Sequence, residues 1–172
     1  MLVTILLSAS LFAFAYIPDE DSITTDMAIV QSIKAQIAAD KSVSNLKINL
    51  ESTEGVVHLS GTTNTDKEAS RIVEIAESTV GVKDVNTEDL KTKKSMHPLD
   101  DTFITAKVKG VFIREKLFGD HTVSPMSIRV ETKNGVVYLT GSVDNRNQID
   151  TAIKLARTID GVKDVQSKVI VK

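Results

Sequence analysis

The side chains that most often carry out chemistry in proteins are sparse in this 172-residue chain. Its three histidines are His58, His97 and His121, and no two of them have the i, i+4 spacing of a zinc-binding helix. The absence of cysteine excludes disulfides and thiolate metal sites. No serine lies in a G-x-S-x-G motif, and no G-x-x-x-x-G-K motif is present. We therefore expect no enzyme activity, no metal site and no cofactor.

One stretch has side chains suited to an anionic surface. In residues 103–118 (FITAKVKGVFIREKLF), apolar residues at helical spacing occupy two sides of a predicted helix, and cations lie between the two sides. Such a helix can place aromatic side chains among lipid headgroups while its cations pair with anionic lipid. The residues that we predict to bind lipid are Lys107, Lys109, Phe112, Arg114 and Lys116.

The two apolar sides of this helix leave two interpretations open. One side must cover a β-sheet within the same domain. The other side either packs against a second domain of the chain or meets a partner outside the protein. The first side contains Phe103, Ala106, Gly110, Ile113 and Leu117. The second side contains Ile104, Val108, Val111, Phe112 and Phe118. Either side fits the sheet, so packing between domains and contact with lipid both remain possible at this stage.

Charge is distributed unevenly along the chain. Residues 18–99 contain 9 Lys and Arg against 14 Asp and Glu, a balance of −5. Residues 100–172 contain 12 against 9, a balance of +3. The net charge of the whole chain is only −2, which argues against a nucleic-acid partner. The basic second half instead favours an anionic phospholipid membrane surface as the partner, and envelope proteins are the alternative partners.

A long internal repeat organises the chain. The sequence GVVHLSG at 55–61 recurs as GVVYLTG at 135–141, and GVKDV at 81–85 recurs unchanged at 161–165. Both pairs are 80 positions apart, and we extend this offset without gaps to the whole repeat. A period of this length exceeds that of solenoid units, so it indicates two copies of one domain.

Each copy predicts the order helix–strand–strand–helix–strand. Glu54-Gly55 and Asn134-Gly135 lie between strand-like runs and favour hairpin turns, and Thr65 with Glu68 has the spacing of a capping box. We expect an α+β protein with two tandem α-β-β-α-β domains, each a three-stranded mixed sheet with two helices on one face. The predicted boundaries are a first domain at 22–90, a linker at 91–101 and a second domain at 102–172.

With these elements assigned, the chain resembles the BON domain family, named for bacterial osmotic-stress and nodulation proteins. The resemblance is carried by TKNGVVYLTG at 132–141 and by ITAKVK at 104–109. It implies a non-catalytic protein of the bacterial envelope, because family members share glycines and core residues rather than a reactive site. Two-domain members are associated with phospholipid binding through the second domain. The alternative that the resemblance allows is an osmotic-stress chaperone or protein-binding module.

The first fifteen residues predict export. Residues 1–15 are uncharged and mostly apolar, too short to span a bilayer, and end in Ala13-Phe14-Ala15, a pattern that signal peptidases cleave. We expect a mature chain that begins near Tyr16 and resides in the periplasm. The alternative is a buried N-terminal core segment. Because no second apolar stretch approaches spanning length, we expect the mature protein to be soluble.

Overall fold

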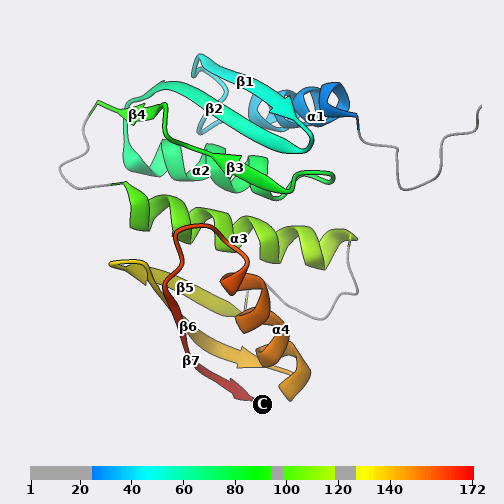
Figure 1. Ribbon diagram of the computed structural model, residues 1–172, viewed down its shortest axis with the longest axis vertical. Coiled ribbons are helices and arrows are strands. Elements are labelled where there is room, and N and C mark those ends of the chain that lie inside the picture. Colours follow the sequence, from blue (N-terminus) through cyan, green and yellow to red (C-terminus); the bar gives the residue numbers. More distant parts are fainter. Residues whose placement is uncertain (1–24, 94–98, 119–126) are drawn as a thin grey trace, which may run out of the picture.

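The computed structural model describes residues 25–93, 99–118 and 127–172 (Figure 1). Two domains follow one another in this part of the chain, and each has a small sheet with two helices on one face. The predicted α+β class with two tandem α-β-β-α-β domains is thus confirmed. The predicted signal peptide, His97 and His121 lie outside the described residues, as do the side chains of Leu117 and Phe118.

The first domain contains two helices and a sheet with one strand more than expected. In chain order its elements are α1 (Asp26–Ala39), β1 (Ile48–Thr53), β2 (Val56–Thr63), α2 (Asp66–Glu77), β3 (Asp84–Asn86) and β4 (Leu90–Thr92). Strand β2 pairs antiparallel with β1 and parallel with both β3 and β4. A turn in which the Leu90 N–H donates to the Thr87 carbonyl interrupts this edge, so two short strands replace one. Strand β4 therefore enters the predicted linker.

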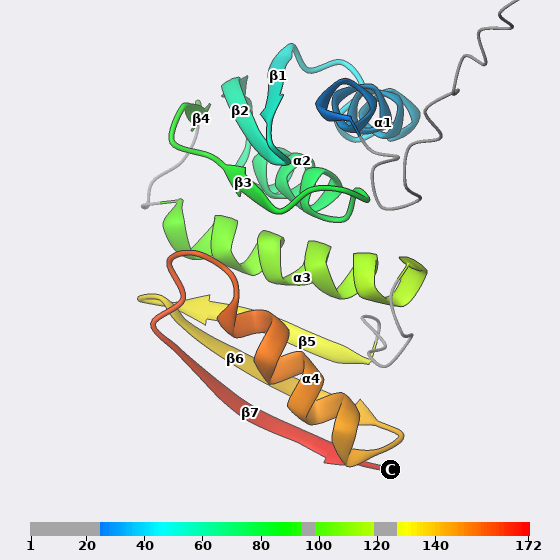
Figure 2. The same cartoon turned by 45° about the vertical axis from the view of Figure 1, so that its right-hand side comes forward.

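The second domain repeats this arrangement with an unbroken edge strand. Its elements are α3 (Asp100–Phe118), β5 (Ile128–Lys133), β6 (Val136–Val143), α4 (Arg146–Arg157) and β7 (Asp164–Val171). Strand β6 is central, antiparallel to β5 and parallel to β7 along its whole length. Figure 2 shows α3 above the sheet of its own domain and below α2 of the first domain.

Both hairpins are tied to the first helix of their domain by an aspartate. The turn residues Asn134 and Gly135 have positive φ angles of 53° and 79°, which asparagine and glycine tolerate. Their N–H groups donate to the Asp101 carboxylate at 2.6 and 2.8 Å. Asp26 accepts the corresponding bonds in the first domain, and hydrogen bonds, first among them that from the Ser52 hydroxyl, lower its pKa.

These aspartates show that the constant offset of 80 is wrong for the first helix of each domain. Asp26 and Asp101 occupy the same place but are 75 positions apart. The difference arises because α3 has 19 residues whereas α1 has 14, so additional residues separate the start of α3 from its hairpin. At the corrected offset, Ile29 corresponds to Ile104, and both are buried.

The corrected alignment identifies which side of α3 covers its own sheet. In α1 the buried side chains Ile29, Ile33 and Ile37 belong to the core of the first domain. Their equivalents in α3 are Ile104, Val108 and Phe112, which belong to the core of the second domain. The second of the two apolar sides is therefore the core side. The first side is available for another contact.

We expect Asp101→Ala to destabilise the second domain, because the two turn N–H groups lose their acceptor. The midpoint of thermal unfolding should fall by about 4–8 °C, the shift produced by a loss of about 1 kcal/mol in a small domain. Circular dichroism measures this midpoint. Asp100→Ala is the control, because the Asp100 side chain is exposed beside the same turn. Equal midpoints for the two variants would contradict the assigned role of Asp101.

Candidate functional site at the interface of α2 and α3

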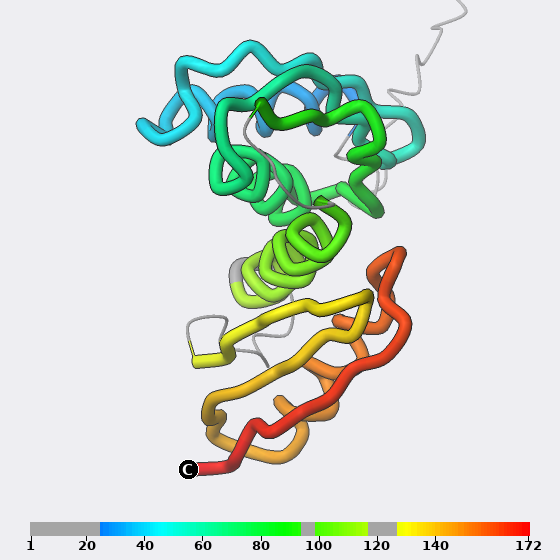
Figure 3. The backbone as a smooth tube through the Cα atoms, turned by 90° about the vertical axis from the view of Figure 1, so that its left-hand side faces the viewer, coloured from blue at the N-terminus to red at the C-terminus, as the bar shows by residue number. Residues whose placement is uncertain are grey.

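Helix α3 contributes side chains to the cores of both domains. Ile104 and Phe112 lie in the core of the second domain, whereas Phe103 and Ala106 lie in the core of the first. Figure 3 shows α3 between α2 and the second sheet. The two apolar sides noted in the sequence thus serve two cores. Packing between domains, which was one of the two open interpretations, is what the structure shows.

The two helices approach each other closely at Gly110. A Cβ atom added to Gly110 would lie 2.5 Å from the Cβ of Glu77 and 2.9 Å from the carbonyl oxygen of Glu74. Because real Cβ atoms do not come this close, any other residue at position 110 would push α2 and α3 apart. In α1 the equivalent position is Ala35, which is exposed to solvent.

Arg114 caps the end of α2 from the neighbouring helix. Its guanidinium donates to the carbonyl oxygens of Glu77 at 2.7 Å and Val82 at 2.8 Å, and to the Glu77 carboxylate at 3.3 Å. The last carbonyls of a helix lack partners within it and carry partial negative charge. Since the last turn of α2 contains no basic residue of its own, Arg114 supplies the missing cation.

Lys107 forms a second polar contact between the domains. Its Nζ atom lies 3.0 Å from Oδ1 of Asp84, the first residue of β3. Lys107 is only 7% exposed, so its alkyl chain is covered while its ammonium group meets the carboxylate at the edge of the interface. Two cations of the basic domain therefore pair with carboxylates of the acidic domain.

Glu77 is the most buried charged residue of this interface. It is 1% exposed, and its Oε2 atom has no hydrogen-bond partner. Burial raises the pKa of Glu77 to about 7, although the nearby charges of Arg114 and Lys107 act in the opposite direction. Nothing in the sequence indicated that the Glu77 carboxyl would be buried, because the pattern of its helix is that of a helix with a solvated charged face.

The five residues predicted to bind lipid do not form one exposed face. Phe112, which we predicted to enter lipid headgroups, is 1% exposed and packs in the second core, so the side chain is not on the surface that this prediction requires. Lys107 and Arg114 contact the first domain, so the same correction applies to them. Lys109 and Lys116 are exposed on α3. While α2 and α3 are in contact, which we call the closed arrangement, only these two of the five predicted residues are exposed enough to meet a membrane.

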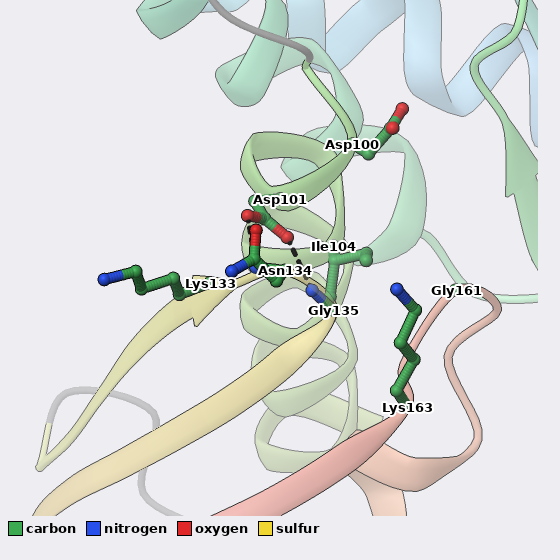
Figure 4. A pocket seen from close by; sticks show the side chains of 8 residues that line it. All are labelled: Asp100, Asp101, Ile104, Lys133, Asn134, Gly135, Gly161 and Lys163. Atoms are coloured by element: carbon green, nitrogen blue, oxygen red, sulfur yellow. Dashed lines mark hydrogen bonds between the residues drawn. The ribbon is translucent and has the colours of Figure 1, made fainter.

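Two hollows of similar composition lie beside the hairpin turns. The hollow in the second domain, of about 830 Å³, is shown in Figure 4, where Asp101 is directed at Asn134 and Gly135 while Lys133 points away. Its counterpart in the first domain lies beside Asp26. Both aspartates already accept hydrogen bonds from the turns, so these repeated residues have a structural role.

The described residues contain little else suited to chemistry. They include no group of three or more His, Asp or Glu side chains that could hold a metal ion. His58 lies exposed on β2. Among the helices that the structure describes, none combines the length and the apolar character needed to cross a membrane.

We expect Gly110→Leu to separate the two domains without unfolding either. The new side chain collides with α2, and overpacking of this kind typically costs about 1–3 kcal/mol. Small-angle X-ray scattering should show an increased radius of gyration, while circular dichroism should keep its helical signal. Ala35→Leu is the matched control, because it adds the same side chain at the equivalent exposed position of α1. A Gly110→Leu variant as compact as the control would contradict the assigned contact.

A family model and a bacterial relative match most of the chain. The family model described as "BON domain" matches residues 25–94 and 100–172. The chain is 32% identical over 146 residues to osmotically-inducible protein Y of Escherichia coli (strain K12), which covers 83% of this chain and 70% of that protein. Among solved structures, the C-terminal domain of CdsD, a type III secretion protein of Chlamydia trachomatis, aligns at a TM-score of 0.31 with 17% identity, over 87% of this chain and 68% of that one. The match of the family model to both domains shows that the chain belongs to the BON domain family.

Proposed function

We propose that this protein acts without catalysis in the bacterial periplasm during osmotic stress, and that it binds anionic phospholipid peripherally through α3 when α2 and α3 separate. The similarity to an osmotically-inducible protein and the two BON domains support the envelope role. The chemistry of the face between the helices supports the lipid contact.

The observation that carries the proposal is the composition of the covered side of α3. It combines the apolar Phe103 with two cations: Lys107 pairs with the Asp84 carboxylate, and Arg114 donates to backbone carbonyls and to the Glu77 carboxylate. Apolar surface bordered by cations is what a helix needs to lie on an anionic membrane. The carboxylates of Asp84 and Glu77 occupy the place that lipid phosphates would take. The acidic first domain thus acts as an internal competitor of the membrane.

Separation of the domains does not require α3 to unfold. Its other side remains anchored in the second domain through Ile104, Val108 and Phe112. The open protein would therefore present a folded helix with its apolar and cationic side uncovered. Lys109 and Lys116, which are exposed in the closed arrangement, would make the first contact with an anionic surface.

We expect Gly110→Leu to bind phosphatidylglycerol vesicles at least about fivefold more tightly than the wild-type chain, because the collision destabilises the closed arrangement by about 1–3 kcal/mol and lowers the cost of opening by the same amount. Vesicle flotation measures the bound fraction. Ala35→Leu, the matched control, should bind as the wild-type chain does. If scattering shows that Gly110→Leu is open but its vesicle binding does not increase, the assignment of lipid binding to α3 is contradicted.

We expect cations of α3 to account for the binding of the open variant. Adding Lys107→Glu and Arg114→Glu to Gly110→Leu should weaken it at least about tenfold, because each cation near an anionic surface contributes about 1 kcal/mol. The same reversals at Lys34 and Lys41, which lie in the first domain, serve as the control. Equal losses would indicate diffuse electrostatics. Binding that is unchanged in high salt or on phosphatidylcholine vesicles, whose headgroups are zwitterionic, would favour the alternative, an apolar surface for protein clients.

A further inference from the structure

We propose that Glu77 acts as a pH-dependent latch between α2 and α3. The two helices associate more tightly when the Glu77 carboxyl is protonated than when it is ionised. As regulation of the lipid-binding face, this inference rests on the proposed function. The latch itself is a property of the two helices and can be tested without lipid.

The latch requires that α3 shields Glu77 from water. Gly110 lies directly over the Glu77 side chain, since an added Cβ would be 2.5 Å from its Cβ and 3.0 Å from its Cγ. Arg114 covers the carboxylate from the next turn of the same helix. When the helices separate, both covers are removed together, and the carboxyl group returns to water. Closure and burial of Glu77 are therefore one event.

The closed interface does not compensate the charge of an ionised Glu77 fully. Only Oε1 has a partner, the Arg114 guanidinium at 3.3 Å, whereas the buried Oε2 has none. A buried carboxylate with incomplete hydrogen bonding is costly, and protonation relieves much of this cost. The closed arrangement consequently favours the neutral carboxyl group more strongly than the open arrangement does.

Arg114 keeps its place when Glu77 takes up a proton. Its two shorter contacts, at 2.7 and 2.8 Å, are to backbone carbonyls of Glu77 and Val82, and their partial charge does not depend on pH. The guanidinium is thus anchored mainly by backbone at the end of α2 and in the loop that follows it. Loss of the negative charge on Glu77 weakens only the longest of the three contacts of Arg114 and leaves the cap intact.

The other charged groups around Glu77 largely neutralise one another. From α3, Lys107 faces Glu77 but is paired with Asp84 of β3. On α2 itself, the preceding turn carries Glu74, which is paired with Arg71. Burial is the largest influence on Glu77 and raises its pKa to about 7; Asp84 acts in the same direction, against Arg114 and Lys107. The ordinary value for a glutamate in water is 4.5.

The direction of the pH effect follows from these two values. Between pH 4.5 and about 7, the closed form holds a proton that the open form releases. Closure is therefore strongest below pH 4.5 and weakens as the pH rises through about 7. Inside this window the closing equilibrium changes by up to about tenfold per pH unit. Acidification closes the latch, and a neutral or alkaline medium favours opening.

The absence of cysteine allows a direct test in the full chain. Lys41→Cys and Lys168→Cys, both at exposed positions in different domains, carry a donor and an acceptor dye. Energy transfer reports closure and circular dichroism reports folding while urea is raised at about pH 5.5 and about pH 7.5; extrapolation to water gives the closing equilibrium constant. We expect this constant to be at least about tenfold larger at the lower pH.

Two variants assign this pH dependence to one group. Glu77→Gln, a neutral side chain of the same size, should close equally well at both pH values, whereas Glu74→Gln, one turn earlier on α2, should behave as the wild-type chain. The proposal is overturned if Glu77→Gln retains the full pH dependence or if the wild-type chain has none. It is also overturned if energy transfer and the helical signal are lost together at both pH values, because Glu77 would then report unfolding rather than opening.

Discussion

The contact between Gly110 and α2 is the constraint on which the arrangement of the two domains depends. Only a residue without a Cβ atom lets α3 approach the backbone of α2 this closely. That approach places Arg114 over the carbonyls at the end of α2 and covers the Glu77 carboxyl. The cap, the ion pair of Lys107 with Asp84 and the buried glutamate are therefore consequences of one small residue in a long helix.

The two copies of the domain share one fold but differ in the role of their first helix. The hairpins, their aspartate anchors and the second helices repeat in both domains, and they maintain the fold. The differences lie on the first helices, because α3 is longer than α1 and carries Gly110, Lys107 and Arg114 where α1 has Ala35, Ser32 and Ala39. The opposite charge balances of the two halves match each other at this interface. Duplication thus produced two similar modules, and divergence of one helix produced a specific contact between them.

Local patterns in the sequence were enough for the fold but not for the site. Both predicted hairpin turns form, with positive φ angles, and the capping box of Thr65 and Glu68 forms with both of its hydrogen bonds. The cations of α3 were harder to interpret, because a cation beside an apolar stripe fits a membrane surface and a helix end equally well. Which one it meets depends on the position of the other domain. An offset of 80 applied to the first helix also concealed that Phe112 is equivalent to the core residue Ile37.

The central claim is that one side of α3 is held by the first domain and is offered to the membrane when the domains separate. Hydrogen–deuterium exchange of the wild-type chain with and without phosphatidylglycerol vesicles tests it most directly. The account predicts that vesicle binding speeds exchange in the last turn of α2 and the following residues 78–82, which lose the cover of α3, while both sheets stay protected. Binding to vesicles with unchanged exchange in this segment would contradict the account, because the domains would then have remained closed.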